Sequence, residues 1–180
     1  MPAQARTYWI TGLPAAGKTS LAQALSQALS LSGRASYVLD GDDLRRGLCS
    51  DLGLSAADRS ENIRRAGEVA RLMADAGVNV VCAFVSPFAA DRQRVRALFE
   101  PAQFIEIFLS TSVDECARRD PKGLYAKAKA GQITGLTGWD ATYERPSSPE
   151  FTFDTEVLSI DQMVQTILEQ RFRPPLALSV

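Results

Sequence analysis

The residues with the clearest chemical signature lie near the N-terminus, in a stretch that fits G-x-x-x-x-G-K-[ST]. It reads Gly12-Leu13-Pro14-Ala15-Ala16-Gly17-Lys18-Thr19 and is followed by Ser20. In this pattern backbone N–H groups surround phosphates, the lysine reaches the terminal phosphates, and the hydroxyl is a ligand for Mg²⁺. A glycine turn that matches by chance is the alternative. The pattern predicts a nucleotide triphosphate site with Lys18 as the catalytic charge.

The flanking residues favour the phosphate-binding interpretation. An apolar run over residues 8–10 predicts a buried strand, and apolar residues at helical spacing predict a helix over residues 20–29. A phosphate loop requires a strand before it and a helix after it. Such a helix directs its free N–H groups and its positive dipole end toward the anion.

A second chemical cluster follows the predicted strand at residues 37–39, in the run Asp40-Gly41-Asp42-Asp43. Ligands bind outside the carboxyl ends of strands in open α/β sheets. Carboxylates at such a place can hold Mg²⁺ or accept a proton from a substrate hydroxyl. The alternative is that Asp42 or Asp43 only caps a helix that begins at Leu44.

Arginines gather around the start of a helix predicted over residues 55–76, which Ser55 caps and Gly77 ends. For most of them a solvated, charge-balanced face is the expected role. The two nearest the ends of elements, Arg45 and Arg59, are candidates to bind an anionic substrate with bidentate hydrogen bonds, with Asn62 one turn later. The full set is Arg45, Arg46, Arg59, Arg64 and Arg65.

The rest of the chain alternates strands and helices until residue 120. The run at 78–85 predicts a strand buried on both faces, followed by a helix at 89–98 and a strand at 104–109. A capping box at Ser112–Glu115 opens a short helix. This order predicts an α/β fold with a mostly parallel sheet and helices on both faces, organised as one domain over residues 1–180.

The segment at 120–149 breaks this alternation with many glycines and prolines. Long connections of this kind are often functional lids, and a lid in a kinase keeps water away from the transferred phosphoryl group. A strand at 151–153 and a helix at about 160–171 follow. The tail from about 173 to 180 is expected to extend from the domain.

Composition excludes several classes of function. The 180 residues carry a net charge of −1, so no global field favours nucleic acid or an anionic membrane, and no run is long enough to span a bilayer. The N-terminus has no apolar signal core. No histidine is present, which excludes catalytic triads. Three cysteines without a pattern predict free thiols in the cytoplasm and no metal site.

Several stretches together resemble the adenylylsulfate kinase family, over about residues 5–170. The most specific are the runs Arg59-Ser60-Glu61-Asn62-Ile63-Arg64-Arg65 and Asp120-Pro121-Lys122-Gly123-Leu124-Tyr125. The resemblance implies a three-layer, P-loop NTPase-type fold with a lid. It also implies transfer of the γ-phosphoryl group of ATP to the 3′-hydroxyl of adenosine 5′-phosphosulfate, with Mg²⁺, in a cytoplasmic homodimer that binds neither nucleic acid nor membrane.

The same resemblance implies roles for individual residues. ATP is expected on the phosphate loop, from Gly12 to Ser20, with Arg119 near the base. Asp42 matches an aspartate near the metal and the acceptor hydroxyl, and is expected as a catalytic residue and metal ligand together with Thr19. The expected contacts to the adenylylsulfate come from Asp42, Arg45, Arg59, Asn62, Val85, Ser86 and Lys122. Ser86 matches a serine described as a phosphoserine intermediate, although in-line transfer needs no covalent step.

The chain departs from the family pattern mildly at residues 14–16, 19 and 43, and more seriously at two other positions. Leu54 and Leu136 stand where the family typically has phenylalanines that sandwich the adenine of the acceptor. Leucine keeps an apolar contact but lacks the stacking face, which contributes roughly 1–3 kcal/mol per base. A related kinase that acts on another nucleotide-linked anion or on a small metabolite is therefore the alternative. A non-catalytic ATP-binding regulator is a third hypothesis, with little support because Lys18, Asp42 and the lid are present.

Overall fold

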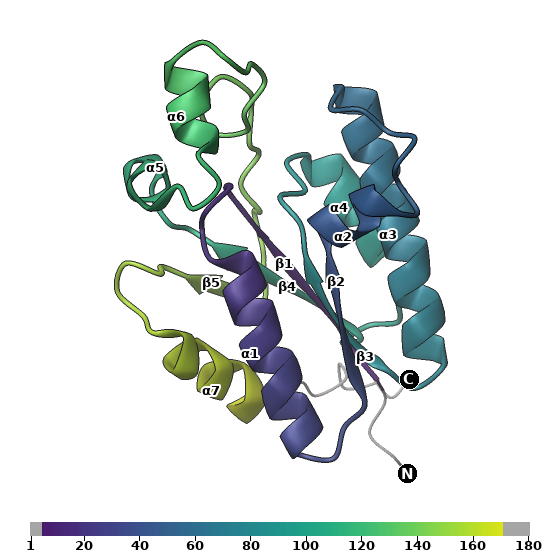
Figure 1. Cartoon of the computed structure of the whole chain (residues 1–180). Coiled ribbons are helices and arrows are strands. Elements are labelled where there is room, and N and C mark those ends of the chain that lie inside the picture. The colour runs from purple at the N-terminus through teal and green to yellow at the C-terminus, as the bar shows by residue number, and fades with distance from the viewer. Residues whose placement is uncertain (1–4, 171–180) are drawn as a thin grey trace.

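In the computed structural model, which describes residues 5–170, a five-stranded sheet carries helices on both faces (Figure 1). All strand pairs are parallel and the strand order is β2-β3-β1-β4-β5. The strands are β1 (Thr7–Gly12), β2 (Ser36–Asp40), β3 (Asn79–Ala83), β4 (Phe104–Leu109) and β5 (Phe151–Phe153). The expected α/β fold with a parallel sheet is confirmed.

The helices form two outer layers around this sheet. In Figure 1, α1 and α7 lie on one face, and α3 and α4 lie on the other. The helices are α1 (Lys18–Leu31), α2 (Gly41–Arg46), α3 (Ala56–Asp75), α4 (Ala89–Arg96), α5 (Val113–Arg119), α6 (Leu124–Lys129) and α7 (Ile160–Glu169).

Each face of the sheet has its own hydrophobic core, because successive side chains of a strand point to opposite faces. Tyr8 belongs to the core under α1 and α7, whereas the neighbouring Trp9 belongs to the core under α3. The Trp9 ring stacks on Phe84, with ring centroids 5.0 Å apart. Burying β1 on both faces fixes the strand that leads into the phosphate loop.

Most predicted helix starts are present, with two corrections. Ser55 and Ser159 cap α3 and α7, and Ser159 forms a full capping box with Gln162. At α5 only half of the predicted box forms: Ser112 accepts a hydrogen bond from the Glu115 amide, but the Glu115 carboxylate pairs with arginines instead.

The second correction concerns the acidic run after β2. The helix begins at Gly41, earlier than expected, so Asp42 and Asp43 lie in its first turn and neither caps it. Asp40 is the cap: its Oδ1 accepts a hydrogen bond from the Asp42 amide at 2.9 Å. The side chains of Asp42 and Asp43 are thereby free of the capping role that was the alternative to a functional one.

The segment at 120–149, here called the lid, contains α6 and a loop closed by Asp140. The Asp140 carboxylate accepts hydrogen bonds from the amides of Gly135 and Leu136. The last helix ends at Glu169, slightly before its predicted end, and the tail at 173–180 lies outside the described residues. Over residues 5–170, no helix is both long and apolar enough to cross a membrane.

Candidate active site

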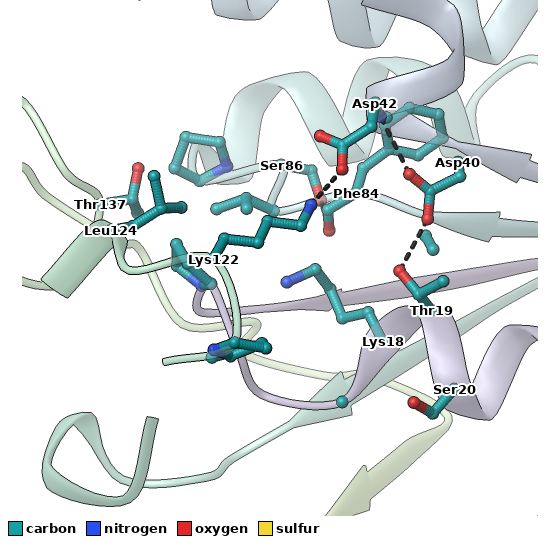
Figure 2. Close-up of a pocket in the computed structure, with 18 of the residues that line it drawn as sticks. Lys18, Thr19, Ser20, Asp40, Asp42, Phe84, Ser86, Lys122, Leu124 and Thr137 are labelled. Atoms are coloured by element: carbon teal, nitrogen blue, oxygen red, sulfur yellow. Dashed lines mark hydrogen bonds and ion pairs between the residues drawn. The ribbon is translucent and has the colours of Figure 1, made fainter. Parts of the chain in front are cut away.

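An open cavity of about 1250 Å³ lies at the carboxyl ends of β1, β2 and β3, between the phosphate loop and the lid (Figure 2). Most of the predicted site residues line it. They are Pro14, Ala15, Gly17, Lys18, Thr19, Ser20, Asp42, Arg45, Leu54, Arg59, Asn62, Val85, Ser86, Arg119, Lys122 and Leu136. The remaining three, Gly12, Leu13 and Ala16, are buried in the loop and do not line the cavity.

The phosphate loop has a conformation that its two glycines make possible. Gly12 has φ +153°, and a Cβ atom there would lie 2.9 Å from the carbonyl oxygen of Leu109. Gly17 has φ +100° and immediately precedes α1. Among the described residues no side chain caps α1, so its first N–H groups remain available to an anion at the cavity.

Lys18 folds back over its own loop. Its Nζ donates hydrogen bonds to the carbonyl oxygens of Gly12, at 2.9 Å, and Leu13, at 2.7 Å. Burial lowers the pKa of Lys18 from 10.5 to about 8, against the opposing effect of nearby acidic groups. A half-buried ammonium without a close carboxylate partner is well suited to receive an anion, which would replace the lost hydration.

Side-chain oxygen atoms of Thr19, Asp40 and Asp42 lie near one another on the side of the cavity opposite Lys18. The hydroxyl of Thr19 donates a hydrogen bond to Asp40 Oδ2 at 2.7 Å, and Asp42 forms an ion pair with Lys122 of the lid (Figure 2). Hydroxyl and carboxylate oxygens are the donor type that Mg²⁺ prefers, so these residues fit that ion when phosphates and water supply the other ligands. No group of three His, Cys, Asp or Glu within residues 5–170 has the arrangement of a metal site formed by protein alone.

The arginines expected to bind an anion lie at the cavity but bind protein groups. Arg45 donates to the carbonyl oxygen of Gly53 at 2.9 Å. Arg59 joins two walls of the cavity, since its Nε donates to the carbonyl oxygen of Leu54 while its terminal nitrogens donate to Thr137 Oγ1 and the carbonyl oxygen of Gly135. Burial lowers the pKa of Arg59.

Asn62 contributes an unused acceptor at the same wall. The residue is 5% exposed, and its Oδ1 is one of two buried side-chain polar atoms without a hydrogen-bond partner among the described residues. Burying a carbonyl oxygen without a hydrogen bond costs free energy, so Asn62 Oδ1 is a suitable acceptor for a hydrogen-bond donor of a bound ligand. By contrast, Arg64 and Arg65 pair with Glu61 on the outer face of α3, as the solvated-face interpretation predicted.

Ser86 has its hydroxyl turned into the protein. It accepts a hydrogen bond from Trp9 Nε1 at 3.1 Å and donates one to Thr11 Oγ1 at 2.9 Å. The residue is 1% exposed and has φ +37°, a conformation rare for a side-chain-bearing residue. The hydroxyl is thus engaged on both sides, and the part of Ser86 suited to a substrate contact is its backbone.

The two leucines at the departing positions differ in exposure. Leu54 is 67% exposed at the cavity rim, whereas Leu136 is 8% exposed in the lid and belongs to the core under α1. Arg59 links them, because it binds the carbonyl oxygen of Leu54 and, on either side of Leu136, the carbonyl oxygen of Gly135 and the hydroxyl of Thr137. The two side chains therefore have defined positions on one cavity.

Sequence reasoning missed two residues of this site. The first is Asp40, which accepts a hydrogen bond from the Thr19 hydroxyl. Its position at the end of β2 was a signal as strong as the one that indicated Asp42. Thr155 lies between the phosphate loop and Arg119, which donates to its hydroxyl at 2.8 Å and to its carbonyl oxygen at 3.1 Å. The Thr155 hydroxyl in turn donates to the carbonyl oxygen of Ala16 at 3.3 Å. No local motif signals Thr155, since its role depends on the pairing of β5 with β4.

Comparison with known proteins agrees with this geometry. The family model for adenylylsulphate kinase matches residues 4–154. The adenylyl-sulfate kinase of Geotalea uraniireducens (strain Rf4) is 55% identical over 160 residues, which cover 89% of this chain and 77% of that relative.

Solved structures of adenylylsulfate (APS) kinases share the fold. The Mycobacterium tuberculosis APS kinase in complex with AMPPNP and APS is 46% identical, with a TM-score of 0.88 over 93% of this chain and 97% of that one. A hexameric APS kinase from Thiobacillus denitrificans is 35% identical, with a TM-score of 0.69 over 92% of this chain and 28% of that one. The match of the family model to residues 4–154 and this identity over most of the chain, together with a phosphate loop and a lid beside one cavity, lead to one conclusion: the chain belongs to the adenylylsulfate kinase family.

Proposed function

We propose that the protein transfers the γ-phosphoryl group of ATP to the 3′-hydroxyl of adenosine 5′-phosphosulfate, yielding ADP and 3′-phosphoadenosine 5′-phosphosulfate. The supporting observation is that one cavity joins the phosphate loop and Lys18 to a second polar wall formed by Arg45 and the unpaired Asn62 Oδ1. A relative 46% identical has been solved in complex with AMPPNP and APS. Two nucleotides can therefore face each other across the cavity.

The roles of the residues follow from what phosphoryl transfer requires. The 3′-oxygen forms a bond to the γ-phosphorus while the bond from that phosphorus to the β,γ-bridging oxygen breaks, so negative charge spreads over the transferred group. Lys18 and the N–H groups at the start of α1 stabilise this charge. We assign to Asp42, which pairs with Lys122 in the ligand-free protein, the role of accepting the proton of the 3′-hydroxyl. Mg²⁺, held near Thr19, Asp40 and Asp42, would neutralise charge on the phosphates.

The lid favours transfer of the phosphoryl group to the acceptor hydroxyl over transfer to water. It carries Lys122 and Leu136 to the cavity and is attached to the opposite wall through Arg59. Closing the cavity excludes water and strengthens the electrostatic interactions inside. We assign Lys122, Arg45, Arg59 and the Val85–Ser86 backbone to the acceptor, and Arg119 with the phosphate loop to ATP.

The deciding experiment is a coupled assay that follows ADP release with ATP, Mg²⁺ and adenosine 5′-phosphosulfate. Wild-type protein is expected to turn over, and Lys18→Ala is expected to lose activity because the charge of the transferred group is no longer neutralised. Lys129→Ala is the matched control, since Lys129 is exposed on α6 and does not line the cavity. Absence of turnover by wild-type protein at saturating acceptor would refute the proposed function.

Assembly and location belong to the same proposal. We propose a homodimer in the cytoplasm. All three cysteines are free and buried, as expected for a protein of a reducing compartment. Burial raises the pKa of Cys82, so this thiol is unreactive and serves the core. Light scattering coupled to size exclusion, at the concentration of the assay, distinguishes a dimer from a monomer or a hexamer.

A further inference from the structure

The interior of the protein contains an arginine that the proposed mechanism does not use. Arg92 lies on α4 and is 3% exposed. Its Nε donates to Glu106 Oε1 at 2.9 Å, which offsets the charge. Its two terminal nitrogens donate to main-chain carbonyl oxygens of Ser86 and Glu144, each at 2.6 Å. A buried guanidinium is retained only when such partners satisfy it, so these contacts define its position closely.

The two carbonyl groups belong to segments that are far apart in the chain. Ser86 is part of the turn after β3, here called the acceptor turn (residues 84–87), which lines the cavity. Glu144 lies where the lid returns toward the sheet. The Glu144 amide donates to the carbonyl oxygen of Pro87 at 2.8 Å, and its carboxylate accepts from the Ala89 amide at 2.7 Å. Glu144 is therefore bound by its amide to the segment before α4, and by its carboxylate and carbonyl groups to Ala89 and Arg92 of α4 itself.

The acceptor turn needs external support because its backbone is strained. Ser86 has φ +37°, and conformations of this kind persist only when the surroundings impose them. Trp9 and Thr11 hold its hydroxyl, while Arg92 holds its carbonyl group. The lid takes part in the same support, because the hydroxyl of Tyr143 lies 2.9 Å from Thr11 Oγ1.

We propose that Arg92 is a positioning residue that holds the acceptor turn and the return of the lid as one unit, so that the acceptor site keeps its shape when the lid closes. The proposal rests on the proposed function, since it concerns binding of the same acceptor. Leu136 and Thr137 lie a few residues before this anchor, and the loop that carries them is closed by Asp140. Movement of the anchor therefore moves the lid wall of the acceptor site.

Arg92→Lys is the principal variant, with Arg96→Lys as its control. Lysine keeps the positive charge beside Glu106 but presents its donors from one point, so it cannot bridge three separated acceptors. Arg96 lies on the same helix and also pairs with Glu106, yet its other ion-pair partner is Glu150, which lies outside the lid and the acceptor turn. Comparing the two separates loss of the bridge from a change in the geometry of the ion pairs that Glu106 forms.

In steady-state kinetics, we expect Arg92→Lys to raise the acceptor KM about tenfold, the effect of losing one charge-assisted hydrogen bond. The ATP KM is expected to remain unchanged, and Arg96→Lys to leave both KM values unchanged. A double variant, Arg92→Gln with Glu106→Gln, removes both buried charges and tests the bridge should Arg92→Lys fail to fold. An acceptor KM equal to that of wild type in whichever of these variants folds would overturn the proposal.

Hydrogen exchange of the ligand-free protein gives a readout that needs no substrate. The amides of Glu144 and Ala89 are expected to exchange faster together in Arg92→Lys, while those of β3 stay protected. If both amides exchange in Arg92→Lys at the same rates as in the wild-type protein, the proposal is overturned. If wild-type protein fails to use adenosine 5′-phosphosulfate, the proposed function fails, and the exchange experiment still decides whether Arg92 couples the two segments.

Discussion

The Thr19 hydroxyl donates a hydrogen bond to Asp40 Oδ2 at 2.7 Å and so joins the phosphate loop to the end of β2. The other carboxylate oxygen of Asp40 accepts from the Asp42 amide and starts α2. One side chain therefore contacts both the hydroxyl that we propose as a metal ligand and the amide of Asp42. We therefore expect Asp40 to contribute to catalysis by holding these two groups in position.

Asp40→Asn is expected to lower kcat by at least about tenfold, because it removes a charged acceptor near the Thr19 hydroxyl. The fold is expected to survive, since asparagine caps helices as well as aspartate does. Kinetics at several Mg²⁺ concentrations provide the measurement, and higher Mg²⁺ is expected to restore part of the rate. Asp75→Asn is the control, because Asp75 is exposed at the end of α3 and does not line the cavity. Equal rates for both variants would contradict the assignment.

ATP binding is expected to weaken as the pH rises through about 8, where Lys18 loses its proton in the free protein. The phosphates of ATP favour the charged form, so ATP raises the pKa of Lys18 and the complex takes up a proton above pH 8. The terminal phosphate does not interfere, since its own pKa is about 6.

Calorimetry at pH 8.5 in two buffers of different ionisation enthalpy measures this proton uptake. Lys18→Met, which cannot titrate, is expected to abolish the pH dependence as well as to weaken binding. A dissociation constant that stays constant from pH 7 to pH 9.5 in the wild-type protein would show that Lys18 is fully protonated before ATP arrives.

Leu54→Phe is expected to lower the acceptor KM, because an aromatic ring at the exposed rim can stack on a base and contribute roughly 1–3 kcal/mol. Leu136→Phe is expected to differ: Leu136 is 8% exposed within the core, so the larger ring costs about 1–3 kcal/mol of stability by overpacking. Leu48→Phe, an exposed position outside the cavity, is the control for Leu54. A higher KM in Leu54→Phe would favour a different acceptor.

Gly67→Ala is expected to destabilise the protein although alanine is the better helix former. The gain in helix propensity is about 1 kcal/mol. The added Cβ would lie 2.7 Å from Cγ2 of Val95, which is 1% exposed and cannot move aside, and such overpacking costs about 1–3 kcal/mol. A lower thermal midpoint than that of the wild-type protein is expected in thermal unfolding. A higher midpoint for Gly67→Ala would show that α3 and α4 can separate.

The strands and longer helices were predictable because local sequence determines them. The β4 prediction matched Phe104–Leu109 in full, since a continuous apolar run bounded by polar residues has few other solutions. The start of α2 was not predictable in the same way. Asp40, Asp42 and Asp43 are all competent caps, and only the register of β2 beside β3 decides that Asp40 has the cap position.

The candidate site was partly predictable for a related reason. Lys18 and Thr19 belong to a motif whose geometry is local, so the sequence alone is enough to predict their arrangement. Arg59 was expected to bind substrate, yet its three hydrogen-bond partners are backbone and side-chain groups at 54, 135 and 137. Contacts between residues more than seventy positions apart leave no local signal, and the contact of Arg92 with Glu144 likewise joins segments far apart in the chain.

Gly138 of the lid packs directly on Leu13 of the phosphate loop, where a Cβ atom would overlap the leucine side chain. The identities of these two residues therefore constrain each other during evolution. A relative with a bulkier residue at the first position needs a smaller one at the second, or a lid displaced from the loop. Across the family the pair should covary, and a variant with alanine at 138 should recover fitness most readily through a reversion or a second change at 13.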